Sequence, residues 1–125
     1  MKQQLANAEL AIMNLLWQEE NLTARQIREK LYPDSNKAQH GTVQRLLQRL
    51  EEKGFIQRDR SLSVHIFAAV ISRHAYAGGQ LEALASELTS GSFAPLITHL
   101  VEKNKITPEE INKIRSILDQ QEQSA

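Results

Sequence analysis

The sequence predicts a mainly α-helical protein, with a small mixed domain at residues 1–71 and a helical region at residues 72–125. Three observations lead to this prediction. Apolar residues recur at helical spacing in several separate stretches, and short β-forming runs gather at one place, around residues 55–70. Residues typical of helix starts, such as Thr23, Ser72 and Thr107, precede three of the helical stretches.

The first helix is expected to open at Asn7 and to end near Gln18 or Glu19. Its apolar side holds Ile12, Met13, Leu16 and Trp17. A lone tryptophan on such a side is expected to pack in the core rather than to serve as a platform for a ligand.

A second, short helix is expected to start after Thr23. Thr23 as N-cap and Gln26 three residues later match a capping box, and Ile27 with Leu31 would form the buried face. The Tyr-Pro-Asp-Ser-Asn stretch at residues 32–36 is then expected to break the chain before the next helix.

The third helix has two chemically different faces. Placed at 100° steps, one stripe holds Val43, Leu46, Leu47 and Leu50 and must be buried. The opposite arc holds Gly41, Gln44, Arg45, Gln48 and Glu52, flanked by Thr42 and Arg49. Glutamine and arginine match the edges of adenine and guanine in a major groove. The alternative is an ordinary solvated face, which can also hold these residues.

A basic hairpin is expected to follow the helix. Lys53 and Gly54 are typical of a helix C-terminus, and the β-formers Phe55, Ile56, Val64, Ile66, Phe67 and Val70 bracket residues 57–63. That stretch has no Gly, Asn or Pro, so a longer loop is expected rather than a tight turn. Its basic and hydroxyl side chains, Arg58, Arg60, Ser61 and Ser63, are suited to phosphate contacts. Alternatively, the hairpin is merely solvated.

Helix, helix, turn, helix and hairpin in this order make a winged helix-turn-helix. The net charge of the chain is zero, but residues 25–60 hold nine lysine and arginine residues against five acidic residues. Residues 72–125 hold five bases against seven acids. Positive charge is therefore concentrated where the helix and hairpin would meet DNA, as expected when phosphate contacts contribute to affinity.

The region 72–125 is expected to form three helices and a dimer interface. Ser72 is placed to cap the first helix, and Thr107-Pro108-Glu109-Glu110 has the pattern of an N-terminus for the last. Gly78 and Gly79 suggest a kink or a close helix crossing. The apolar stripes can hardly all be buried within one short chain, so a second subunit is expected to cover them. The proposed dimerisation residues are Leu81, Leu84, Leu88, Phe93, Leu96, Ile97, Leu100, Ile111, Ile114 and Leu118. The alternative is that these helices fold back on the domain of their own chain.

Three stretches resemble the penicillinase repressor family (BlaI, MecI and CopY type): AELAIMNLLW, TVQRLLQRLEEKGFIQR and LVEKNKITPEEINKIRSIL, within about residues 5–120. The resemblance implies a homodimeric bacterial repressor on an inverted-repeat operator, relieved by a membrane sensor protease or a metal ion. The chain has no cysteine, which excludes the copper-thiolate route of some members. The family's cleavage position corresponds to His99-Leu100 here instead of Asn-Phe, so a protease selective for Asn-Phe is not expected to cut.

Other classes of protein find no support in the sequence. His40, His65, His74 and His99 lack the companions of a metal site, and no nucleophile or nucleotide-binding motif occurs, so neither an enzyme nor a cofactor is predicted. No apolar run near membrane-spanning length and no export signal is present, and the absence of cysteine is compatible with the cytoplasm.

The sequence thus predicts a sequence-specific DNA-binding transcriptional regulator, a homodimeric repressor in the cytoplasm with double-stranded DNA as its partner. Thr42, Gln44, Arg45 and Gln48 are expected to read bases, and Arg49, Arg58, Arg60 and Ser61 to hold the backbone, with His40 at the start of the same helix. The alternative function is a winged-helix module that docks a protein partner.

Overall fold

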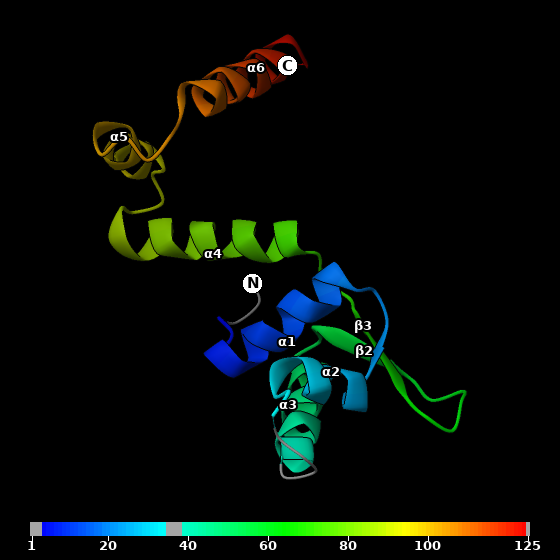
Figure 1. Ribbon diagram of the computed structural model, residues 1–125. Coiled ribbons are helices and arrows are strands. Elements are labelled where there is room, and N and C mark those ends of the chain that lie inside the picture. The colour runs from blue at the N-terminus through cyan, green and yellow to red at the C-terminus, as the bar shows by residue number, and fades with distance from the viewer. Residues whose placement is uncertain (1–3, 35–38, 125) are drawn as a thin grey trace. The chain divides into compact units, whose positions relative to one another are not determined.

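The computed structural model describes residues 4–34 and 39–124. The chain forms two compact units, Met1–Gln80 and Leu81–Ala125. Its elements in order are α1 (Asn7–Gln18), β1 (Leu22–Thr23), α2 (Ala24–Leu31), α3 (His40–Glu52), β2 (Ile56–Asp59), β3 (Ile66–Ala69), α4 (Arg73–Leu88), α5 (Ala94–Glu102) and α6 (Pro108–Ser124). This order confirms the mainly α-helical fold with a winged helix-turn-helix, whose hairpin loop projects beyond α1–α3 (Figure 1). The predicted break at residues 32–36 lies partly outside the described residues, because Ser35 and Asn36 are not among them.

A three-stranded antiparallel sheet in the order β1-β3-β2 supports the three helices. The strand β1 was not expected from the sequence, because two residues are too few for a periodic pattern; it pairs Leu22 with Phe67. The assignment of residues 57–59 to the turn is wrong: they continue β2 and pair with residues 66–68 of β3. The expected longer loop is therefore confined to residues 60–65, while Val64 and Val70 lie outside the strands and are exposed.

The core of the first unit is built by the predicted stripe of α3. Its four members are buried: Val43, Leu46, Leu47 and Leu50. They pack with Ile12, Met13 and Leu16 of α1, with Ile27 of α2, and with Phe55 and Phe67 of the hairpin. Trp17 is partly buried against this core, as expected, and its indole N–H donates a hydrogen bond to the Ile71 carbonyl at 2.8 Å.

Local contacts fix where the helices begin and end. At α2 the predicted capping box forms, because the Gln26 N–H donates to the Thr23 hydroxyl at 3.1 Å and the Thr23 N–H donates to the Gln26 side chain at 2.9 Å. After α3, Gly54 has φ of 82°, a left-handed conformation that glycine adopts without a Cβ penalty. The chain thereby turns directly from α3 into the hairpin.

A buried ion pair joins α1 to the end of α3. Lys53 Nζ donates to both carboxylate oxygens of Glu9 at 2.9 Å, and Glu9 is only 2% exposed. Burial alone would raise the Glu9 pKa, but hydrogen bonds from Lys53 and the Ala6 N–H, with the charges of Lys53 and Arg49, outweigh it. The Glu9 pKa therefore lies below its ordinary value of 4.5.

The start of α4 belongs to the first unit. Ser72 accepts a hydrogen bond from the Ala75 N–H at 3.0 Å, which is the expected cap. One turn later the Tyr76 hydroxyl accepts from the Leu5 N–H at 2.9 Å, and its ring contacts Trp17 and Phe55. Apart from its chain neighbours and the backbone of its own helix, a Cβ at Gly78 or Gly79 would meet no atom within 4 Å, so among the described residues no crossing element explains this pair.

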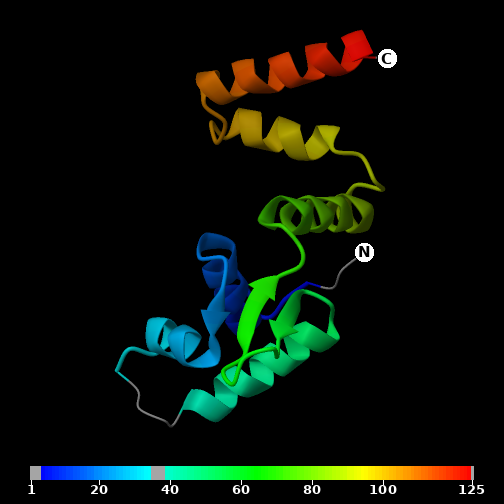
Figure 2. The same ribbon diagram turned by 90° about the vertical axis from the view of Figure 1, so that its right-hand side faces the viewer.

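Helices α4, α5 and α6 follow one another through short connections (Figure 2). The expected cap of α6 forms, since the Glu110 N–H donates to the Thr107 hydroxyl at 3.1 Å. Within the described part of residues 81–123, Ala85 is the one buried residue. No described helix has both the length and the apolar character needed to cross a membrane.

Candidate nucleic-acid interface

The outer face of α3 carries polar side chains. Gln44, Arg45, Gln48 and Arg49 are exposed, whereas Thr42 is partly buried. The apolar stripe on the opposite side is fixed in the core, so the orientation of the exposed face is set by packing. Forked amide and guanidinium groups on one exposed helix face are what direct readout of base edges requires.

Two of these glutamines are oriented by neighbours one turn away. The Gln44 amide nitrogen lies 3.2 Å from His40 Nε2, and the Gln48 amide nitrogen donates to Glu52 at 3.3 Å. A side chain held in one rotamer loses less entropy when it binds a partner. These contacts favour particular rotamers on the exposed face of α3.

The arginines of the hairpin are not equivalent. Arg58 lies over the Phe67 ring at 4.8 Å, pairs with Glu51 at 3.3 Å, and has a side chain only 16% exposed. Arg60 pairs with the other oxygen of Glu51 at 3.4 Å, but its side chain is 59% exposed. Glu51 thus anchors both arginines to α3, which leaves Arg60 the more accessible of the two.

The loop between the strands begins with a local turn. The Ser61 N–H donates to the Asp59 carboxylate at 2.9 Å. The hydrogen bonds from Ser61, together with the nearby His65, lower the pKa of Asp59 below its ordinary 3.8. Further along this exposed loop, Leu62 and Val64 present apolar surface at 59% and 58% exposure.

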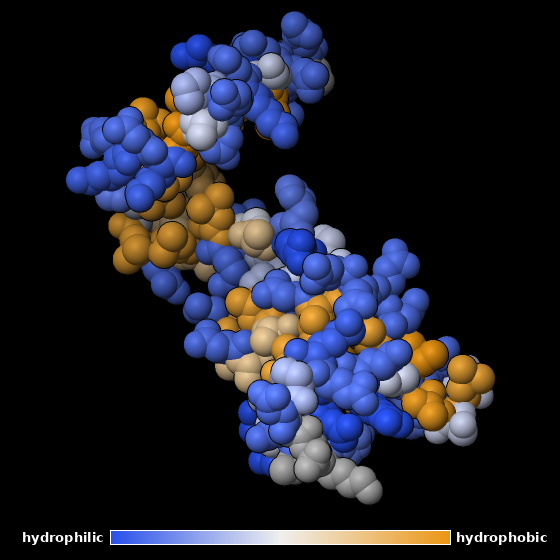
Figure 3. Space-filling model, viewed as in Figure 1, coloured by the Kyte–Doolittle hydropathy of each residue, from blue (hydrophilic) through white to orange (hydrophobic). Residues whose placement is uncertain are grey.

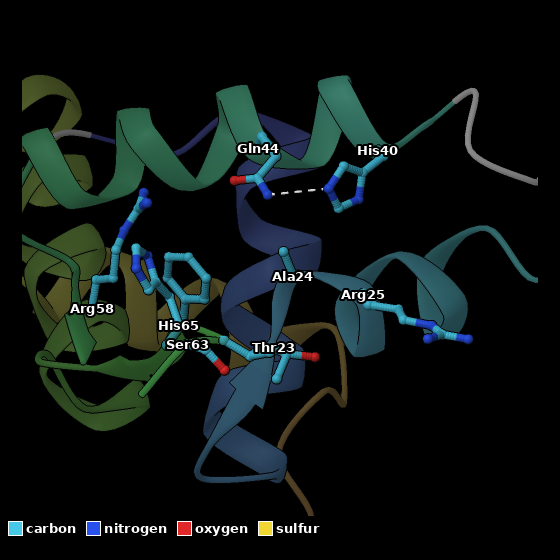
Figure 4. Close-up of a pocket in the computed structure, with 10 residues that line it drawn as sticks. Thr23, Ala24, Arg25, His40, Gln44, Arg58, Ser63 and His65 are labelled. Carbon is cyan, nitrogen blue, oxygen red and sulfur yellow. Dashed lines mark hydrogen bonds between the residues drawn. The ribbon is translucent and has the colours of Figure 1, made fainter. Parts of the chain in front are cut away.

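A cleft of about 410 Å³ lies between α2, α3 and the hairpin, and we refer to it as the hairpin cleft. Its polar lining comprises Thr23, Arg25, His40, Gln44, Arg58, Ser63 and His65. Figure 4 shows His40 and Gln44 on α3 across from Arg58, Ser63 and His65 of the hairpin. Arg25 extends along α2, where its Nε pairs with Glu29 at 3.0 Å.

The structure divides the residues expected to contact DNA into groups. His40, Gln44 and Arg58 meet at the hairpin cleft, whereas Arg45 and Gln48 lie on the exposed face of α3. Arg49 is exposed but near enough to Glu9 to affect its pKa. Sequence reasoning missed Thr23, Arg25 and His65 as neighbours of this surface, because periodicity gives no information about contacts between distant segments. It also missed Glu51 as the anchor of the hairpin arginines.

The residues expected to form a dimer interface are mostly exposed in the single chain. Leu81, Leu84, Leu88, Phe93, Ile97, Leu100, Ile114 and Leu118 are between 37% and 69% exposed, while Leu96 and Ile111 are partly buried. Val101 and Ile117, which the expectation omitted, are exposed as well. Figure 3 shows apolar surface gathered on the C-terminal helices.

Comparison with known proteins identifies the relatives of this chain. The family described as "Penicillinase repressor" matches residues 5–120. The chain belongs to this family. It is 24% identical over 116 residues to the methicillin resistance regulatory protein MecI of Staphylococcus aureus, covering 93% of this chain and 94% of that protein. It is 36% identical over 101 residues to the transcriptional regulator BlaI of Mycobacterium tuberculosis, covering 79% and 72% of the two chains.

A further relative and a solved structure are also similar to this chain. The penicillinase repressor of Bacillus licheniformis is 22% identical over 117 residues, covering 94% of this chain and 91% of that protein. The solution structure of the DNA binding domain of the repressor BlaI aligns with a TM-score of 0.48 and 25% identity, covering 61% of this chain and 94% of that domain. The family match confirms the predicted class, a DNA-binding transcriptional regulator and not an enzyme.

Proposed function

We propose that this protein is a homodimeric repressor that binds an inverted-repeat DNA operator in the cytoplasm. The observation that carries the proposal is the exposed Gln/Arg face of α3, backed by a buried apolar stripe and flanked by a basic hairpin. Membership of the penicillinase repressor family supports the same conclusion. Residues 1–71 would form the DNA-binding domain, and residues 72–125 the dimerisation region.

Within the DNA-binding domain, we assign different roles to α3 and the hairpin. Thr42, Gln44, Arg45 and Gln48 read bases in the major groove. Arg49, Arg60 and Ser61 contact the phosphate backbone, which positions the domain without specifying sequence. Arg58, held by Glu51 and Phe67, sets the position of the hairpin and offers its remaining donors to a phosphate.

The case for a dimer rests on the apolar side chains of the C-terminal helices. Ten large apolar residues between 81 and 118 are at least 37% exposed in the single chain. Exposed apolar surface of this extent is unusual for a monomer and marks an interaction surface. A twofold-related copy would bury it and would also place two α3 helices on the two halves of a palindrome.

The mode of induction differs from that of cysteine-containing copper sensors, because this chain has no cysteine to form a copper-thiolate site. A membrane sensor protease of the family's type would have to act at His99-Leu100, inside α5. We propose that a protease selective for Asn-Phe leaves this bond intact. Incubation with such a sensor protease followed by mass spectrometry tests this, and clean cleavage between these residues would refute it.

Selection of bound sequences from a random duplex pool, with the purified full chain at two salt concentrations, tests the proposed repressor. An inverted repeat, bound more weakly as salt rises, is expected. Recovery of no sequence beyond background, or affinity insensitive to salt, would instead favour a module that docks a protein partner.

Two substitutions test the roles of α3 and the hairpin on the selected operator. Arg45→Ala should reduce discrimination at one operator position by about 1–3 kcal/mol, whereas Arg60→Ala should weaken all sequences similarly. Arg115→Ala, an exposed change in α6, serves as the control and should alter neither property. Equal losses from Arg45→Ala and Arg60→Ala on every sequence would show that the assigned roles are wrong.

A further inference from the structure

The hairpin cleft collects nitrogen-bearing side chains from segments that are far apart in the sequence. His40 comes from the start of α3, Arg58 from β2, His65 from the residue before β3, and Arg25 from α2 at the rim. Hydroxyl groups of Thr23 and Ser63 lie in the same lining. No carboxylate is among the described residues that line the cleft. Its lining therefore suits an anion rather than a cation.

Within the described part of the chain, two nitrogen atoms of residues that line the cleft lack a hydrogen-bond partner. The Gln44 amide nitrogen lies 3.2 Å from His40 Nε2, so this ring nitrogen has a partner. Among the described residues, His40 Nδ1 is shielded from solvent and has no hydrogen-bond partner, and the same holds for Arg58 Nε. Shielded polar atoms without a hydrogen-bond partner are costly, so a small shift of the lining that lets a bound oxyanion reach them would be favoured.

We propose that the hairpin cleft binds a phosphate group of the DNA backbone, and that binding strengthens as His40 and His65 take up protons. The proposal rests on the proposed function, because the DNA supplies the phosphate. Imidazole is the side chain that ordinarily changes charge between about pH 5 and 8, and each proton adds a positive charge beside the phosphate. Acidification within that range should therefore tighten DNA binding.

The charged groups that face the two histidines are known from the structure. Arg25 and Arg28 of α2 line a second pocket with His40, and Arg25 is paired with Glu29. Near His65 lie Asp59, and also Arg58, which shares Glu51 with Arg60. Guanidinium and carboxylate groups ordinarily keep their charge between about pH 6 and 8, whereas imidazole is the side-chain type that ordinarily changes charge there.

The test measures binding of the full chain to a labelled duplex of random sequence at pH 8 and pH 6, over a range of salt concentrations. A random duplex removes base readout by Gln44 from the result. We expect the affinity to rise about 5-fold or more on acidification, with the salt dependence steeper by roughly 0.9 for each additional phosphate neutralised. Calorimetry in two buffers of different ionisation enthalpy should detect proton uptake on binding.

Matched variants locate the effect. The double variant His40→Gln/His65→Gln should show a much smaller change in affinity between pH 8 and pH 6 than the wild type does. His74→Gln changes an exposed histidine of α4 outside the cleft and should keep the full gain. His40→Lys/His65→Lys, which holds its charge at both pH values, should bind tightly at both. Thermal melts of each variant establish that it is folded.

The outcomes separate the proposed phosphate site from the proposed function. DNA binding that strengthens equally in the wild type and the His40→Gln/His65→Gln variant would overturn the site and leave the repressor intact. Absence of DNA binding at both pH values would instead refute the proposed function. In that case, pyrophosphate titrated into the free protein would test whether the hairpin cleft binds a phosphate group without DNA. Saturable shifts of the His40 and His65 imidazole resonances, without a shift of His74, would support a phosphate site, and no shift would overturn it.

Discussion

The two units of this protein use the same kind of amphipathic helix in opposite ways. In the first unit the apolar stripe of α3 is buried against α1, α2 and the sheet, and Leu47 and Leu50 are fully inaccessible. In the second unit α5 contains no buried residue, and Leu118 of α6 is 58% exposed. An amphipathic pattern in the sequence therefore predicts that a stripe will be covered, but not whether its own chain covers it.

This difference separates two sources of stability. The first unit contains a core that draws on all its helices and strands, so it should unfold cooperatively by itself. The second unit has little buried apolar surface of its own, and its stability should depend on the concentration of a partner. Each of the following substitutions tests one side of this contrast.

The largest loss of stability is expected from a cavity in the first unit. Leu47→Ala removes a fully buried side chain and should lower the free energy of unfolding by about 2–5 kcal/mol, measured by urea denaturation. Leu88→Ala makes the same change at a side chain that is 69% exposed. It should leave the unfolding of the first unit unchanged, and equal losses from both would contradict the contrast.

A charge on the exposed stripe of α6 should break the assembly. Leu118→Glu would place one carboxylate from each subunit in the proposed apolar interface. Because this replaces buried apolar surface with charge, the dimer dissociation constant should rise by roughly 100-fold or more. Sedimentation equilibrium measures this constant. Asn112→Glu adds the same charge at an exposed polar position of α6 and should change it little. If the wild-type chain is itself monomeric, the proposed dimer is wrong.

The buried ion pair gives the first unit an acid-dependent stability. Because the Glu9 pKa is lowered in the folded state, its contribution is fully present above its ordinary value of 4.5 and is lost as the pH falls below it. Glu9→Gln should cost about 1–3 kcal/mol at neutral pH and much less near pH 3. Urea denaturation at both pH values measures the difference.

The exposed pair of Glu19 and Lys30, 3.0 Å apart, supplies the control for Glu9. Glu19→Gln should cost less than about 0.5 kcal/mol at neutral pH, because solvent screens exposed pairs. A loss from Glu9→Gln as small as that from Glu19→Gln would mean that burial does not strengthen the Glu9–Lys53 pair.

Modest effects are expected from the two threonine caps, which have matching geometry in the two units. Thr23 and Thr107 each accept a backbone hydrogen bond at 3.1 Å. Thr23→Ala should lower the stability of the first unit by about 1 kcal/mol at any protein concentration. Thr107→Ala should act mainly through the dimer, so its effect on the melting temperature should depend on concentration. If the effects of Thr23→Ala and Thr107→Ala on the melting temperature depended on protein concentration in the same way, the proposed difference in how the two units are stabilised would be wrong.

Most helices of the fold could be predicted, because their stripes and caps are local properties of the sequence. The stripe from Val43 to Leu50 and the box at Thr23 were predictable for this reason. The strand β1 could not be predicted, since Leu22 and Thr23 become a strand only through pairing with β3. The extension of β2 to Asp59 has the same origin: polar residues join a strand when a partner satisfies their backbone.

The polar face of the candidate interface could be predicted as a set of residues but not as an arrangement. The positions of Gln44 and Arg45 follow from helical periodicity alone. The meeting of His40 with His65 depends on how α3 and the hairpin pack, and the sequence separation between them carries no such information. The binding of Arg58 and Arg60 to Glu51 likewise appears only in three dimensions.

The shared contact at Glu51 also has a meaning for protein engineering. One carboxylate stands beside two guanidinium groups, so it offsets part of the positive field that the hairpin projects. Removing that carboxylate would strengthen the positive electrostatic field of the hairpin without adding a lysine or an arginine. It would also remove the contact that holds Arg58 and Arg60 to α3. A substitution at Glu51 would therefore increase the attraction of the hairpin for an anion and reduce the rigidity of the hairpin at the same time.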